Sequence, residues 1–107
     1  MNLLDGLGQR ALGQLAPKLA ALSDEVLFGD VWQRPQLSKR DRSLITVATL
    51  LALGRSEQLP FHFNLARAHG VSDEELRELG THLAFYAGWP AAASALTVQG
   101  RLDEAQE

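Results

Sequence analysis

The sequence contains no cysteine among its 107 residues. This absence excludes disulfide bonds, thiolate nucleophiles and cysteine metal ligands. No apolar run approaches the ~20 residues that span a bilayer, and the longest, residues 44–53, is interrupted by Thr46 and Thr49. Asp5, Gln9 and Gln14 also interrupt any signal-peptide core near the start of the chain. We therefore expect a cytoplasmic protein without a membrane partner.

Positive charge and recognisable ligand motifs are scarce as well. Ten Lys and Arg residues stand against thirteen Asp and Glu, so the net charge of -3 disfavours nucleic acid as a partner. The sequence has no pair or cluster of His, Asp and Glu residues with convincing metal spacing, and no phosphate loop or nucleophile elbow. We therefore expect neither a metal nor a cofactor.

Hydrophobic residues make up 46% of the chain and charged residues 21%, which is typical of one folded domain spanning residues 1–107. Proline and glycine divide the chain into segments of helical length, and no segment alternates like a strand. The sequence thus predicts an all-α fold, a small bundle of about five to six helices. The expected helices cover residues 3–15, which form a short or frayed helix, 17–28, 38–53, 57–69 with Ser56 as the cap, a segment that begins with the Ser72–Glu75 capping box, and residues 91–105.

Apolar residues at helical spacing predict where these helices are buried. Val47 and Leu50 lie in a third helix that is apolar on nearly all sides, and such a helix is buried in a core or between subunits. In the fifth helix, the buried stripe is expected to contain Leu76, Leu79, Leu83 and Tyr86. The apolar third helix and the alanine-rich last helix together predict an obligate oligomer.

Three histidines can exchange protons near neutral pH. His62 stands between two phenylalanines, and His82 follows Glu78 and precedes Tyr86 by four residues each, so these three can share one helix face. His69 precedes a glycine, where it suits the C-terminus of a helix. For each histidine a surface or core role is the commoner alternative.

A cluster of basic residues lies just before and within the start of the third helix: Arg34, Lys39, Arg40 and Arg42. Cations are disfavoured at a helix N-terminus. A solvated helix start is the ordinary interpretation. The alternative is that Arg34 or Arg42 binds an anionic substrate, as arginine does with carboxylates.

Several blocks of the sequence resemble the carboxymuconolactone decarboxylase family. They are the tryptophan and arginine block at residues 31–44, the Leu-Ala-Leu-Gly-Arg run at 51–55, His62, the turn at 70–75, and the block from His82 to Ala92. The last block is shared by the wider alkylhydroperoxidase D-like superfamily. The tryptophan and arginine block is more typical of the decarboxylases.

The resemblance implies an alkylhydroperoxidase D-like fold that assembles as a homotrimer or hexamer. It implies a cofactor-free decarboxylation of a small carboxylated lactone, or of a related intermediate of aromatic catabolism. His62 is the residue that the resemblance marks for proton transfer. The residues implied in substrate binding are Trp32, Arg34, Arg42, His82 and Tyr86.

Two departures from the family pattern leave a second function class open. Gln58 replaces an expected carboxylate, and Pro60 with Phe61 and Phe63 makes the surroundings of His62 apolar. These departures favour a non-catalytic oligomeric helical protein, whereas the retained histidine and arginine residues favour a lyase. The thiol-peroxidase branch of the superfamily is excluded, because it needs a pair of cysteines.

Overall fold

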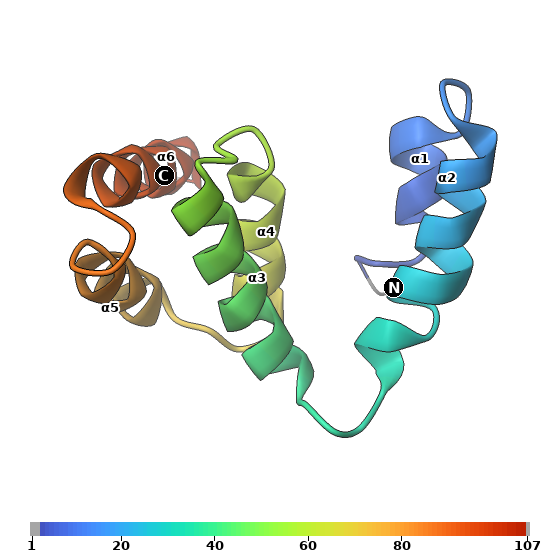
Figure 1. Ribbon diagram of the computed structural model, residues 1–107, viewed down its shortest axis with the longest axis horizontal. Helices are drawn as coiled ribbons and strands as arrows, with labels where there is room; N and C mark the ends of the chain where they lie inside the picture. The colour runs from blue at the N-terminus through green and yellow to red at the C-terminus, as the bar shows by residue number, and fades with distance from the viewer. Residues whose placement is uncertain (1–2, 107) are drawn as a thin grey trace. The chain divides into compact units, whose positions relative to one another are not determined.

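The computed structural model describes residues 3–106, which form an all-α protein with six α-helices, one π-helix and one 3₁₀-helix (Figure 1). Contacts along the chain divide it into two compact units, Met1–Lys39 and Arg40–Glu107. We call them unit 1 and unit 2 and describe each by itself. No helix in the described range is both long enough and apolar enough to cross a membrane.

Unit 1 contains α1 (Leu7–Leu12), α2 (Pro17–Leu22), the π-helix η1 (Ser23–Phe28) and the 3₁₀-helix η2 (Val31–Gln33). The expectation of a helix from residue 17 to 28 is confirmed, with a change from α to π geometry after Leu22. Pro17 lies in its first turn, where the missing amide hydrogen costs no hydrogen bond. The expectation of a short first helix is confirmed: α1 has six residues, and the glycines near its ends disfavour further helical structure.

A carboxylate of η1 stabilises the start of α1. The Asp24 side chain accepts hydrogen bonds from the backbone amides of Gly8 at 2.6 Å and Gln9 at 3.0 Å. These amides belong to the first turn of a helix, where they lack intrahelical partners. A Cβ on Gly8 would lie 2.4 Å from the carbonyl oxygen of Ala20, so this close approach of α1 to α2 requires glycine.

Unit 2 is built mainly from α3 (Lys39–Leu53), α4 (Leu59–Ala68), α5 (Asp73–Leu83) and α6 (Trp89–Gln106). The Ser72–Glu75 capping box is present with both of its hydrogen bonds, as the sequence predicts. The expected Ser56 cap is wrong: α4 starts later, at Leu59, and its N-cap residue is Gln58, whose side chain makes no capping bond. Gly54 ends α3 with a φ of 72°, which a side chain would disfavour.

The core of unit 2 lies between its four helices and contains Val47, Leu51, Leu59, Phe63, Ala66, Val71, Leu76 and Ala95. The predicted burial of Val47 and Leu76 is confirmed. Leu50, Leu79 and Leu83 are only half-buried and pack against this core. Tyr86 does not belong to the buried stripe, because α5 ends at Leu83 and leaves its side chain 78% exposed.

Within the single chain α3 is buried on one side only, and burial of its other side between subunits stays a prediction. Its buried residues, Ser43, Val47 and Leu51, follow one another at intervals of four and form a single stripe. Ile45 and Leu53 lie off this stripe and remain 52% and 63% exposed. The helices of unit 2 therefore cover one side of α3 and leave apolar surface on another.

An ionic network connects three helices of unit 2. Arg67 of α4 donates to Asp73 of α5 at 2.6 Å and to Asp103 of α6 at 2.5 Å, and Arg77 of α5 donates to the other oxygen of Asp103 at 2.5 Å. The Arg67 side chain is only 16% exposed, so water screens its contacts less than it would at an open surface. The network fixes the ends of α4, α5 and α6 relative to one another.

Candidate functional site

His62 lies in the first turns of α4, close after Pro60. Its side chain is half-buried, and the ring of Phe61 meets it edge-on at a centroid distance of 5.2 Å. Leu59, Leu65 and Ala66, which are near it on the helix, are all buried. The expected apolar neighbourhood of this histidine is therefore present.

The Nδ1 atom of His62 is shielded from solvent and has no hydrogen-bond partner in the part of the chain that the structure describes. Burial lowers the pKa of His62 below its usual 6.5, because desolvation disfavours the charged ring. A neutral imidazole with an uncommitted ring nitrogen can accept a proton and return it. A purely structural histidine would more often have both ring nitrogens bound to protein groups.

Arg42 is the fourth residue of α3, and its Nε atom is buried. The adjacent Ser43 is 1% exposed, and its hydroxyl lies 2.8 Å from Nδ1 of His69 at the end of α4. This contact shows that the start of α3 lies beside the end of α4. His62 is seven residues before His69, so it lies about 10 Å further along α4, at 1.5 Å per residue.

Trp32 and Arg34 belong to unit 1. Trp32, in η2, is 5% exposed, whereas Arg34 is exposed and has the extended backbone (φ −69°, ψ 140°) that the following proline predicts. Their roles in substrate binding stay predictions.

His82 and Tyr86 are brought into contact at the end of α5. Their rings stack at a centroid distance of 5.0 Å and an interplanar angle of 29°. Both side chains are exposed. Their predicted spacing of four residues thus produces a surface pair, and their part in a substrate pocket stays a prediction.

The pairing of Ser43 with His69 was not expected from the sequence. His69 was expected as a favourable charge at a helix C-terminus, and it is indeed the C-cap residue of α4. Ser43 follows four charged residues at the start of α3, so nothing in the sequence marked it as buried. Across residues 3–106 there is no group of three His, Asp or Glu side chains that could hold a metal ion.

A family model places this chain among known proteins. Residues 17–99 match the model described as the carboxymuconolactone decarboxylase family, and the chain belongs to that family.

Two curated relatives have names that state an activity. A 4-carboxymuconolactone decarboxylase of Acinetobacter baylyi is 46% identical over 69 residues, which cover 64% of this chain and 52% of the relative. A nitrosuccinic acid decarboxylase of Metarhizium robertsii is 36% identical over 77 residues, which cover 72% of this chain and 54% of the relative. The chain thus spans about half the length of these relatives.

A third relative is an uncharacterised 15.0 kDa protein of Paracoccus denitrificans. It is 28% identical over 97 residues, which cover 89% of this chain and 72% of the relative. The similarity to this protein covers more of the chain, but its name states no activity.

Proposed function

We propose that this chain is a cofactor-independent decarboxylase that acts on a small carboxylated molecule. The observation that carries the proposal is His62, half-buried, with a shielded and unpartnered Nδ1 atom among the described residues. Two further facts support it: the chain belongs to the carboxymuconolactone decarboxylase family, and both relatives with a named activity are decarboxylases. A small carboxylated lactone, or a related intermediate of aromatic catabolism, is the proposed substrate.

The chemistry requires little beyond binding and proton transfer. The bond between the carboxylate carbon and its neighbour breaks, carbon dioxide leaves, and the electron pair moves into a conjugated acceptor such as a lactone carbonyl. The His62 ring takes up a proton from water, delivers it to the carbon that lost the carboxylate, and thereby returns to its neutral form. A positioned acid–base group of this kind typically accelerates a reaction by ~10²–10⁴-fold.

Binding of the anion is the proposed role of Arg42 and Arg34. An arginine can hold a carboxylate through two parallel hydrogen bonds. Arg42 lies on α3 and His62 on α4, and both helices contribute residues to the core of unit 2 (Figure 1). Arg34, Trp32, His82 and Tyr86 are proposed to bind substrate on the strength of the family resemblance.

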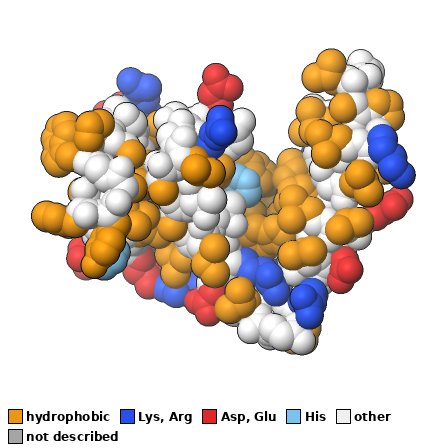
Figure 2. Space-filling model, in the orientation of Figure 1, with side chains coloured by type: hydrophobic (Ala, Val, Ile, Leu, Met, Phe, Trp, Pro, Cys, Tyr) orange, Lys and Arg blue, Asp and Glu red, His pale blue; other side chains and the backbone are white. Residues whose placement is uncertain are grey.

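We further propose that the chain works as a homo-oligomer, a trimer or a hexamer, in the cytoplasm. Large apolar side chains reach the surface of unit 2, and Figure 2 shows such side chains over α5 and α6. Phe85 is 86% exposed and Trp89 is 74% exposed, and Ile45 and Leu53 of α3 add to this apolar surface. Exposed apolar area of this kind is typical of a subunit interface.

The alternative is a non-catalytic oligomeric protein that keeps the family scaffold. One observation favours it: the hollows described on unit 2 are lined by residues other than His62. Gln58, which replaces an expected carboxylate, is also exposed at the N-cap of α4. An activity measurement separates the two functions.

The test is turnover of 4-carboxymuconolactone and of nitrosuccinic acid by the full chain, measured as carbon dioxide release. We expect His62→Ala to lower the rate at least ~10²-fold, because the proton donor is lost. Ala68→Ser, an exposed change on the same helix, is the control and should keep the rate within about twofold.

Partial rescue of His62→Ala by added imidazole would support proton transfer at this position. An unchanged rate in His62→Ala would move the chemistry to another residue. The absence of turnover with a panel of small carboxylated lactones and aromatic acids, in a folded protein, would favour the non-catalytic alternative.

A further inference from the structure

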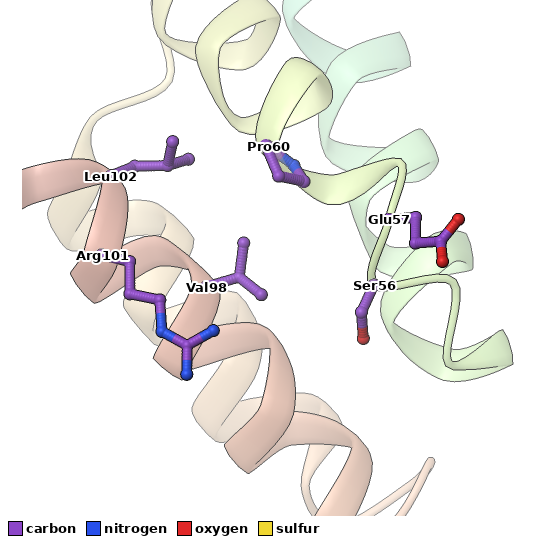
Figure 3. A pocket seen from close by; sticks show the side chains of 6 residues that line it. All are labelled: Ser56, Glu57, Pro60, Val98, Arg101 and Leu102. Atoms are coloured by element: carbon purple, nitrogen blue, oxygen red, sulfur yellow. The ribbon is translucent and has the colours of Figure 1, made fainter. Parts of the chain in front are cut away.

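A groove on unit 2 lies between the α3–α4 turn and α6. It consists of two adjoining hollows of about 340 Å³ each, which share Ser56, Val98 and Arg101 in their lining. Figure 3 shows one of them, with Ser56 and Pro60 on one side and the α6 side chains on the other. The proposed decarboxylase site uses none of these residues.

One end of the groove offers hydrogen-bond donors to an anion. Arg101 is exposed, and none of the ion pairs found among the described side chains includes its guanidinium group. Arg40, Arg67 and Arg77 of the same unit differ from it, because each of them contacts a carboxylate. The Arg101 guanidinium is therefore available to a ligand, and charge-assisted hydrogen bonds from arginine to carboxylate are among the stronger polar contacts.

Two serine hydroxyls can add to this donor set. Ser56 lines both hollows, and Ser94 lines the hollow that also contains Thr97. No side-chain hydrogen bond of Ser56 or Ser94 is found among the described residues, so each hydroxyl can donate to a ligand oxygen. Thr97 cannot donate in the same way, because its hydroxyl already donates to the carbonyl oxygen of Ala93 at 2.8 Å.

The other end of the groove is apolar. Pro60, Val98 and Leu102 converge there, and Figure 3 shows Val98 and Leu102 projecting from α6 toward Pro60. The Glu57 carboxylate lies on the α3–α4 turn and points away from Arg101. The negative charge of Glu57 at the rim repels negative charges on a ligand. A ligand with one anionic group is therefore preferred over a ligand with several.

We propose that this groove binds a small monocarboxylate with an apolar body. Its carboxylate contacts Arg101 with help from Ser56 and Ser94, and its apolar part lies against Pro60, Val98 and Leu102. This ligand site is separate from His62 and does not depend on the proposed decarboxylase activity.

The test is a titration of the isotope-labelled full chain with benzoate, followed by backbone NMR. We expect saturable shifts of the amides of Ser56, Ser94 and Arg101. Arg101→Gln should weaken benzoate binding at least about fivefold, because the charged hydrogen bonds are lost at a partly solvated position. Arg55→Gln is the matched control, since it removes the same charge from an exposed residue outside the lining, and it should change the affinity less than about twofold.

Two other probes test the two ends of the groove. Benzamide has the same shape without the charge and should bind more weakly than benzoate, whereas inorganic phosphate lacks the apolar body and should also bind more weakly. Equal affinity of Arg101→Gln and the unmodified chain for benzoate would overturn the proposal. Benzoate shifts confined to residues around His62 and Arg42 would do the same, because they would assign the binding to the proposed catalytic site.

Discussion

At the scale of single residues, His62 combines an apolar setting with a polar atom that has no partner within the described structure. Protein interiors seldom leave a buried nitrogen without a hydrogen bond, and exceptions often have a functional cause. Burying this nitrogen lowers the free energy of unfolding. The size of the effect depends on pH, because the ring can take up a proton.

The lowered pKa of His62 gives this dependence a direction. The ring of the folded protein takes up its proton at a lower pH than the ring of the unfolded chain, which does so near pH 6.5. The unfolded state then binds more protons, so the free energy of unfolding falls as the pH drops from about 6.5 toward the lowered pKa. The measurement is urea unfolding at about pH 7.5 and about pH 5.5. We expect the free energy of unfolding to fall less between these two pH values in His62→Gln than in the unmodified chain. Equal losses in both proteins would contradict the assigned burial.

Leu76 provides the corresponding test of the core. It is 1% exposed and belongs to the hydrophobic cluster of unit 2. Leu76→Ala should cost about 2–5 kcal/mol in the free energy of unfolding, because it removes packed methyl groups and leaves a cavity. Leu79→Ala is the matched change at a half-buried position of the same helix and should cost less. A larger cost for Leu79→Ala would show that the buried face of α5 is misplaced.

At the scale of elements, α5 has the most explicit start signal in the chain. The Ser72 hydroxyl accepts from the Glu75 amide at 3.0 Å, and the Glu75 carboxylate accepts from the Ser72 amide at 2.9 Å. The backbone hydrogen bond to Ser72, followed by the Arg40 contact, also lowers the pKa of Glu75.

Removing this cap should destabilise the protein. Ser72→Ala leaves an amide of the first turn without its side-chain acceptor, and we expect a loss of about 0.5–2 kcal/mol by thermal or urea unfolding. Glu78→Ala, an exposed change later in α5, is the control and should stay within about 0.5 kcal/mol. A Ser72→Ala protein as stable as the unmodified chain would mean that water replaces the cap at no cost.

At the scale of the whole molecule, apolar side chains remain exposed on both units. In unit 1, Leu15, Leu19, Leu22 and Val26 recur at helical spacing and are each at least 42% exposed. In unit 2, apolar side chains are likewise exposed on one side of α3 and around the α5–α6 turn. Surfaces of this kind are usually covered by another subunit.

We therefore expect sedimentation velocity at micromolar concentration to show a trimer or a hexamer. A double change, Ile45→Glu with Leu53→Glu, should shift the chain toward smaller species, because charged side chains are disfavoured at the core of an interface. The exposed change Lys18→Gln is the control. A stable monomer of the unmodified chain would defeat the oligomer prediction.

The sequence by itself determined the all-α class, the cap of α5, the proline positions in α2 and α4, and the extended Arg34 before Pro35. These features depend on local backbone chemistry: the side-chain oxygen of Ser72, the fixed φ of proline and the steric clash that proline imposes on its neighbour. The sequence blocks also carried the family resemblance. The lowered pKa of His62 follows from the sequence as well, because the residues around this histidine are apolar.

Only the tertiary structure decided which apolar positions are covered. It placed Leu50, Leu79 and Leu83 at the border of the core and left one side of α3 open, because burial depends on where neighbouring helices pack rather than on the pattern of one helix. It also paired Ser43 with His69, 26 residues apart, and left Arg101 outside the ion pairs found among the described side chains. Contacts between residues so distant in the sequence follow from the packing of whole helices, which no local signal specifies.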